Sequence, residues 1–213
     1  MQIIVVDNAS TDRTAELAQS AGATVVHEAE RNIARVRNAG AANASHDVLI
    51  FLDADTLVPT ELLARIARIM ADPMCIGGAV DSLHRSNSLI VRAYLKFWRI
   101  LGFMGGMAQG ACQYCRKSVF QELDGYDETW YLGEDVDFYL CLKRHARQRG
   151  LQTCLIRDLQ VMPSPRRRNH LGKAYPLRMQ SESSNKLSEE SGDHRRNRRR
   201  AQHLDPGLFD SCR

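Results

Sequence analysis

The first third of the chain alternates between short apolar runs and helix-like segments. Continuous apolar residues, rich in Ile and Val, cover residues 3–6 and 48–52, and residues 23–26 form a similar run that is interrupted only by Thr24. Because a strand buried on both faces of a parallel sheet is apolar at every position, these runs predict three such strands. Capping residues predict helices between Asp12 and Gly22, over 34–44 and over 59–70. The alternation predicts an α/β fold with a mainly parallel sheet flanked by helices.

The second half of the chain has a less regular pattern. Strands are predicted at 76–80, within 111–120 and at 153–156, and helices at 86–104 and 136–149. The helix at 86–104 mixes apolar and basic residues, so it is either a core helix or an interfacial helix in peripheral contact with a membrane. No run of about 18 apolar residues occurs, and the first residues do not resemble a signal peptide. We therefore expect a cytoplasmic protein, with membrane association as the second interpretation.

Charge is distributed unevenly along the 213 residues. Residues 166–213 hold 12 of the 29 Lys and Arg residues but 6 of the 25 Asp and Glu, within a net charge of +4. From about residue 180 the sequence is polar without apolar periodicity, which predicts disorder because little surface can be buried. We predict one folded domain at 1–175 and a basic, disordered tail at 176–213. The basic run Arg195–Arg200 contains no interleaved aromatic residues, so no specific nucleic-acid partner is predicted.

Carboxylates stand where two of the predicted strands end. Asp7 follows the first strand, and Asp53 and Asp55 follow the third. In open α/β sheets, ligands bind at the carboxyl ends of the strands. Alternation along an extended segment places Asp53 and Asp55 on one side, where like charges favour a hard cation, Mg²⁺ or Mn²⁺, shared with a phosphate. The alternative is that these residues only end strands and cap the next helix.

A second acidic group, formed by Glu134, Asp135 and Asp137, stands at the start of a predicted helix. The structural interpretation is that acidic side chains stabilise the positive end of the helix dipole. The functional interpretation is that one of them is a general base that accepts a proton from a hydroxyl group.

Three segments occur in a fixed order, with sequences IIVVDNASTDRT, VRNAGAANASHDVLIFLDADT and LDGYDETWYLGEDVDF. Together they resemble the family 2 glycosyltransferases of the GT-A fold, over about residues 2–165. The resemblance implies inverting transfer of a sugar from a nucleotide diphosphate-sugar donor, with Mg²⁺ or Mn²⁺ as cofactor. It also implies a saccharide, lipid-linked or small-molecule acceptor and a role in cell-envelope polysaccharide synthesis.

The same resemblance implies a role for each carboxylate. Asp7 matches the aspartate that contacts the nucleoside. Asp53 matches the residue nearer the ribose and sugar, and Asp55 matches the residue that binds the metal on the diphosphate. Asp135 matches the catalytic base, with Glu134 as its neighbour on the donor side.

For several other charged residues the sequence leaves two possible roles open. Arg31, Arg35 and Arg37 either contact the diphosphate or are solvated residues of an Ala-rich helix. Glu134 and Asp137 are the rivals of Asp135 for the role of base, and adjacent helical residues project about 100° apart.

The start of the sequence departs from the family pattern. Family members usually begin with a strand of the type Ser-Val-Ile-Ile-Pro-x-Tyr-Asn that lies centrally in the sheet, whereas here the strand at 3–6 stands first. We therefore expect this strand to have an unpaired edge. Two alternative functions remain: a catalytically inert remnant that only binds a partner, and a sugar nucleotidyltransferase, although the Gly-rich phosphate loop of the latter is not visible.

Overall fold

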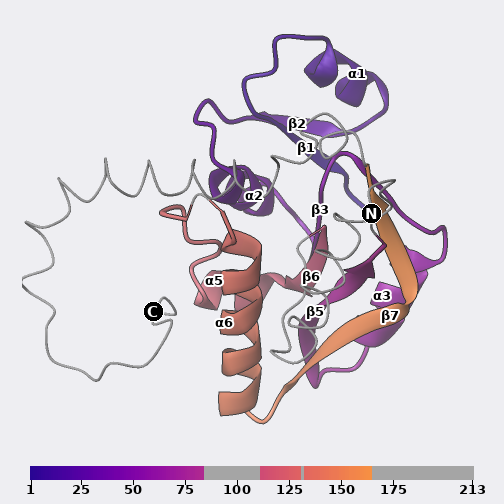
Figure 1. The fold of residues 1–213 in the computed structure, drawn as a ribbon, viewed down its shortest axis with the longest axis vertical. Coiled ribbons are helices and arrows are strands. Elements are labelled where there is room, and N and C mark those ends of the chain that lie inside the picture. The colour runs from indigo at the N-terminus through magenta and orange to yellow at the C-terminus, as the bar shows by residue number, and fades with distance from the viewer. Residues whose placement is uncertain (84–110, 131, 165–213) are drawn as a thin grey trace, which may run out of the picture.

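A computed structural model describes residues 1–83, 111–130 and 132–164 (Figure 1). The strands are β1 (Ile4–Asp7), β2 (Thr24–His27), β3 (Val48–Leu52), β4 (Thr56–Leu57), β5 (Cys75–Ser82), β6 (Cys112–Arg116) and β7 (Gln152–Pro163). The helices are α1 (Thr14–Ser20), α2 (Ile33–Ala42), α3 (Leu62–Met70), α5 (Lys117–Glu122) and α6 (Glu134–Gln148). The predicted helix at 86–104 and the predicted tail at 176–213 lie outside the described residues.

The described strands form two hydrogen-bonded sheets. β1 and β2 pair in parallel, and a five-stranded sheet has the order β3-β6-β5-β7-β4. In the larger sheet β5 and β7 are parallel, whereas the other three pairs are antiparallel. The α/β class is as predicted, but the sheet is mixed rather than mainly parallel. A continuous apolar run indicates burial on both faces and carries no information about the direction of the neighbouring strand.

Helix α2 packs against strands of both sheets. Gly40 faces β1, where an added Cβ would lie 3.2 Å from Cγ2 of Val6. Ala34 and Ala41 belong to a buried core cluster that also contains Phe51 of β3. Gly40 therefore lets α2 approach β1 closely, while Ala34 and Ala41 pack into the core cluster that contains Phe51. Within the described part of the chain β1 pairs with β2 alone.

An aromatic cluster holds the segment before α6 against β3. It consists of Phe51, Phe120, Tyr126 and Phe138, whose neighbouring ring centroids lie 4.6 to 5.8 Å apart. All four are buried. Burying one such side chain contributes about 1.5–3 kcal/mol, so the cluster fixes the start of α6 relative to the end of β3.

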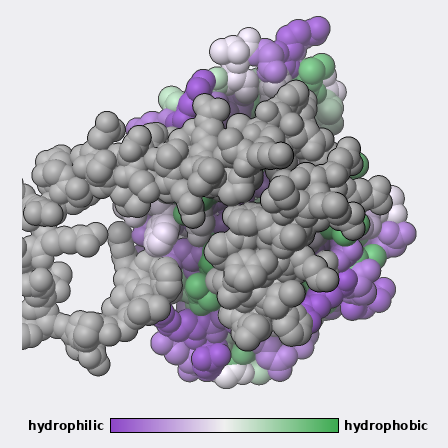
Figure 2. Space-filling model, viewed as in Figure 1, coloured by the Kyte–Doolittle hydropathy of each residue, from purple (hydrophilic) through white to green (hydrophobic). Residues whose placement is uncertain are grey.

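On the face shown in Figure 2, the visible surface of the described residues is largely polar. Figure 2 shows mainly hydrophilic residues where they are visible on this face, with hydrophobic residues in small separate areas. Among the described residues, no helix is both long enough and apolar enough to cross a membrane.

Candidate active site

Arg37 of α2 joins two of the predicted acidic sites. Its Nη2 donates to Oδ1 of Asp53 at 3.0 Å, and its Nη1 donates to Oε1 of Glu134 at 2.7 Å. The guanidinium also lies 5.2 Å from the centre of the Tyr126 ring, within the range of a cation–π interaction. The side chains of Arg37 and Glu134 are only 11% and 6% exposed. A single buried arginine thus brings the end of β3 and the start of α6 together.

Burial and neighbouring charges have opposing effects on the pKa values of the two carboxylates that Arg37 binds. Burial raises the pKa of Asp53, while the charge of Arg37 lowers it. Burial and the charge of Asp135 raise the pKa of Glu134, again against the influence of Arg37. Asp135 and Asp55 also raise the pKa of Asp53, so these negative charges lie close enough to repel one another. A bound cation would relieve this repulsion.

Main-chain hydrogen bonds to the end of β7 hold the segment that carries Asp55. β4, which follows immediately, pairs with the end of β7, with Thr56 opposite Pro163. The N–H of Ser164 donates to the main-chain oxygen of Asp55 at 3.0 Å. Strand β7 continues well past the predicted end at residue 156, and its last residue and the residue that follows it provide these two contacts. The Asp55 side chain is exposed, and its carboxylate accepts no hydrogen bond from another described residue.

The donor chemistry at this end of β3 fits a divalent cation. Asp55 offers hard carboxylate oxygens, which Mg²⁺ and Mn²⁺ prefer, and Arg37 already occupies one oxygen of Asp53. In the described part of the chain no group of three or more His, Cys, Asp or Glu residues could enclose a metal. A cation here would therefore need further oxygen ligands from a bound molecule or from water.

Asp7 lies apart from the Arg37 cluster. It ends β1, its side chain is 8% exposed, and its Oδ2 lies 3.3 Å from Nδ1 of His27 at the end of β2. A hydrogen bond with Ser10 lowers the pKa of Asp7, and His27 contributes in the same direction. Asp7 is therefore a buried, ionised hydrogen-bond acceptor. The structure does not join it to Asp53 or Asp135 through a shared contact of the described residues.

Asp135 stands in the first turn of α6, after Gly133 with φ of +88°. Its neighbour Glu134 turns into the protein toward Arg37, whereas Asp135 is half-buried. The main-chain oxygen of Asp135 accepts a hydrogen bond from Nε2 of Gln113 at 2.8 Å. Its carboxylate has no hydrogen bond or ion pair with another described residue.

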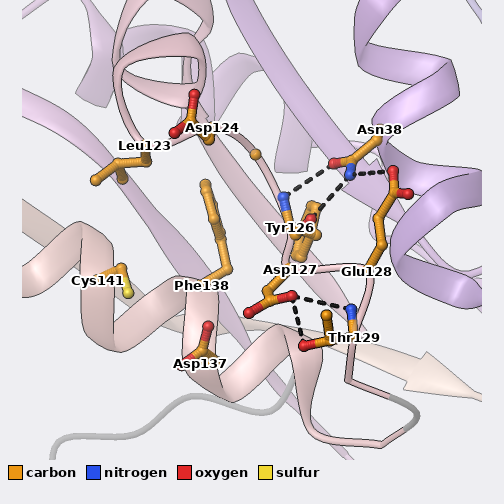
Figure 3. A pocket seen from close by; sticks show the side chains of 11 residues that line it. Asn38, Leu123, Asp124, Tyr126, Asp127, Glu128, Thr129, Asp137, Phe138 and Cys141 are labelled. Atoms are coloured by element: carbon orange, nitrogen blue, oxygen red, sulfur yellow. Dashed lines mark hydrogen bonds between the residues drawn. The ribbon is translucent and has the colours of Figure 1, made fainter. Parts of the chain in front are cut away.

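The loop that precedes α6 is clamped by α2. The Asn38 side chain accepts from the N–H of Tyr126 at 2.9 Å and donates to the carbonyl oxygen of Tyr126 at 2.8 Å. It also donates to Glu128 at 3.0 Å, and Glu128 accepts from Arg35 at 3.1 Å. Figure 3 shows the hydrogen bonds of Asn38 to Tyr126 and Glu128 along one side of a pocket of about 270 Å³. The pocket is lined by residues 123–129, Asn38 and the start of α6, including Asp137.

Gly125 is required by this clamp, and we expect Gly125→Ala to destabilise the protein. Gly125 has φ of +73°, and an added Cβ would lie 2.6 Å from Oδ1 of Asn38. The left-handed conformation alone costs about 1–2 kcal/mol for a residue with a Cβ, and the clash adds to it. The measurement is the thermal midpoint.

The matched control is Gly150→Ala. Gly150 has φ of +67°, but an added Cβ there would meet nothing within 4 Å. We expect the midpoint to fall further for Gly125→Ala than for the control. An equal fall in the thermal midpoint of the two variants would show that the contact with Asn38 does not require glycine at position 125.

Sequence analysis alone missed the role of Arg37 and the contacts of Gln113 and Asn38. The solvated interpretation is wrong for Arg37, because its side chain is buried and forms ion pairs with the buried Glu134 and the partly exposed Asp53. The sequence spacing could have indicated that Arg37 is buried. Arg37 lies three residues after Ala34 and four before Ala41, which places it on the buried face of α2. Arg35 instead forms ion pairs with glutamates outside this cluster.

Known protein families give an independent comparison. A family model described as "Glycosyl transferase family 2" matches residues 1–123, which is more than half of the chain. The matched part includes β1, α2 and the end of β3, which carry Asp7, Arg37, Asp53 and Asp55.

Solved structures share this fold at low sequence identity. A mannosyltransferase from Pyrobaculum calidifontis, in complex with GDP-Man and Mn²⁺, is 22% identical, with a TM-score of 0.57 over 76% of this chain and 47% of that one. S. aureus TarS 1-349 with UDP is 15% identical, with a TM-score of 0.57 over 77% and 52%. Glucosyl-3-phosphoglycerate synthase from Mycobacterium tuberculosis, with Mn²⁺, UDP-glucose and phosphoglyceric acid, is 19% identical, with a TM-score of 0.56 over 79% and 62%. The chain spans about half to three fifths of the length of these proteins.

Proposed function

The chain belongs to glycosyl transferase family 2, and on this premise we propose that it transfers a sugar, with inversion, from a nucleotide diphosphate-sugar donor to a hydroxyl acceptor. The family and the GT-A fold predicted from the sequence are confirmed. The solved proteins of this fold bind GDP-Man, UDP or UDP-glucose, which supports a nucleotide-sugar donor.

The observation that carries the proposal is the double ion pair of Arg37. It brings Asp53, at the carboxyl end of β3, to the same place as Glu134, at the start of α6. A transfer reaction needs the donor and the acceptor to meet, and the closeness of Asp53 to the turn that carries Asp135 supports a site of this kind. Because the guanidinium offsets part of the negative charge of the two carboxylates, the fold can hold them close together.

On the donor side, we assign the nucleoside to Asp7 and the ribose and sugar to Asp53. Asp7 is an ionised acceptor at the end of β1 and suits an N–H of a base. Asp53 is partly exposed and keeps one oxygen for the donor, because Arg37 uses the other. Glu134 was assigned to the donor from the family resemblance, and its bond to Arg37 supports an indirect role through that arginine.

A divalent cation, Mg²⁺ or Mn²⁺, would be held chiefly by Asp55. When bound, it would supply positive charge to the diphosphate that leaves with the nucleoside. Two of the solved proteins of this fold are complexes with Mn²⁺, which supports this choice. The chain itself contributes the exposed carboxylate of Asp55, positioned by the pairing of β4 with β7.

On the acceptor side, we assign the general base to Asp135. A hydroxyl is a poor nucleophile at neutral pH, and a carboxylate within hydrogen-bond reach can take its proton as it attacks. Attack on the side of the anomeric carbon opposite the departing diphosphate inverts the configuration. The acceptor class remains a saccharide, a lipid-linked molecule or a small molecule, in cell-envelope synthesis in the cytoplasm. No observation on the described residues favours the inert or nucleotidyltransferase alternatives.

The proposal is tested first by a donor screen. UDP-glucose, GDP-mannose and dTDP-sugars are incubated with the full chain and Mn²⁺, and binding and hydrolysis of the donor are measured. Binding or hydrolysis of at least one donor supports the proposal, and neither with any donor contradicts it.

The cation assignment predicts that Asp55→Asn weakens Mn²⁺-dependent nucleotide binding about tenfold or more, equivalent to about 1.4 kcal/mol. An amide keeps the shape but removes the charge that holds the cation. The control is Asp47→Asn, because Asp47 is an exposed aspartate at the opposite end of β3. Unchanged Mn²⁺-dependent affinity in Asp55→Asn, measured by titration calorimetry, would rule out Asp55 as the chief ligand.

A further inference from the structure

A chain of buried hydrogen bonds ends on the main chain of Asp135. The hydroxyl of Tyr126 lies 2.9 Å from Oε1 of Gln113, and Nε2 of Gln113 lies 2.8 Å from the carbonyl oxygen of Asp135. Tyr126 is 1% exposed and Gln113 is 2% exposed. Two polar side chains are therefore kept inside the core, where an unsatisfied polar group would be costly.

Only one orientation of the Gln113 amide satisfies this chain. A carbonyl oxygen can only accept, so the amide must present Nε2 to Asp135 and Oε1 to Tyr126. Tyr126 must then donate its O–H, and burial raises the pKa of Tyr126, which keeps that proton in place. The tyrosine hydroxyl thus fixes the direction of the glutamine, and the glutamine fixes the first turn of α6.

The tyrosine is itself fixed on the opposite side. Asn38 of α2 binds both main-chain polar groups of Tyr126, and the guanidinium of Arg37 lies over its ring. Arg37 also binds Glu134, the residue before Asp135. The first turn of α6 is therefore held at two adjacent residues, through the side chain of one and the carbonyl oxygen of the other.

We propose that Tyr126 and Gln113 are positioning residues that set the place of Asp135 relative to the carboxyl end of β3. This inference rests on the proposed function, because it concerns the residue assigned as the base. Neither side chain reaches the reacting groups. They act through the main chain of Asp135, and a shift of that turn lengthens the path of the proton.

Three full-length variants separate positioning from general stability. Tyr126→Phe removes one hydroxyl and keeps the ring in the aromatic cluster, and Gln113→Met removes the amide at similar volume. The matched control is Tyr114→Phe. Tyr114 lies next to Gln113 on β6 and is equally buried, but its hydroxyl donates to the carbonyl oxygen of Cys154 on β7 and not to the main chain of the first turn of α6.

Hydrogen exchange at the main-chain amides of residues 137–140 is the readout that does not depend on catalysis. We expect exchange about tenfold faster in Tyr126→Phe and Gln113→Met than in the unaltered protein, and unchanged exchange in Tyr114→Phe. Equal exchange in all four proteins overturns the inference.

Turnover of the donors used in the screen above is the second readout. We expect kcat to fall about tenfold in Tyr126→Phe and in Gln113→Met, with the donor KM unchanged and no further loss in the double variant. Faster exchange with unchanged kcat would overturn the link to catalysis. If the unaltered protein turns over no donor while exchange still responds, the proposed function fails and the positioning of this turn stands.

Discussion

Replacing Asp135 by asparagine is expected to lower transfer about a hundredfold or more while leaving donor affinity nearly unchanged. An amide keeps the size of the side chain but cannot accept the proton of the acceptor hydroxyl, and general bases contribute about 10²–10⁴ to a rate. The Asp135 carboxylate has no partner among the described residues, so its loss costs the fold little. The measurement is kcat with the donor held at saturation, together with the dissociation constant of the donor.

Asp137→Asn is the matched control for this experiment. Asp137 lies in the same turn of α6 but lines the pocket beside residues 123–129. We expect this variant to keep most of the turnover. If Asp135→Asn transfers normally and Asp137→Asn is inactive, the base is Asp137 and the pocket of Figure 3 is the place where the acceptor hydroxyl binds.

The fold could be predicted from the sequence where the pattern of apolar residues repeats. The run at 48–52 coincides with β3, and the helix predicted at 34–44 overlaps α2. What the pattern could not give was the direction of the strands, because an apolar run is the same for parallel and antiparallel neighbours. The length of β7 was also missed, since Arg157, Asp158 and Gln160 interrupt the apolar pattern. Beyond them Val161 pairs with β5, and Met162 and Pro163 pair with β4.

The site was predictable only as a set of separate motifs. The positions of Asp53 and Asp55 at a strand end follow from local sequence, and so does the acidic start of α6. The proximity of these two acidic sites does not follow from local sequence, because it depends on Arg37 and on buried polar groups such as Gln113. Polar residues inside a core carry no apolar periodicity, so only the packed structure shows that they are satisfied there.

Arg37→Gln is expected to cause the largest loss of stability. The ion pair with Glu134 is almost wholly buried, and removing one partner of such a pair costs about 3–5 kcal/mol because the other charge is left without compensation. For a domain of this size the thermal midpoint should fall by roughly 6–20 °C. The lost ion pair with Asp53 adds less to the loss of stability, because the Asp53 side chain is 45% exposed and water can solvate it in place of the arginine.

The loss should depend on pH in a defined direction. Burial already raises the pKa of Glu134 in the folded protein, and Arg37 opposes that rise. A carboxyl whose pKa is raised on folding stabilises the fold below its unfolded pKa and loses this contribution as the pH rises through the folded pKa. Without Arg37 the pKa rises further, so the stability gap to the unaltered protein is widest near neutral pH and narrows as the solution is acidified. Urea unfolding at several pH values measures this gap.

A second substitution distinguishes a lost charge balance from lost packing. In Arg37→Gln/Glu134→Gln both members of the buried pair are neutral amides, so no uncompensated charge remains and most of the stability should return. The pH dependence of the gap should disappear with it, because the group that takes up the proton is gone. If the double variant is as unstable as Arg37→Gln and keeps the same pH dependence, Arg37 stabilises the fold through its contact with the Tyr126 ring rather than through Glu134.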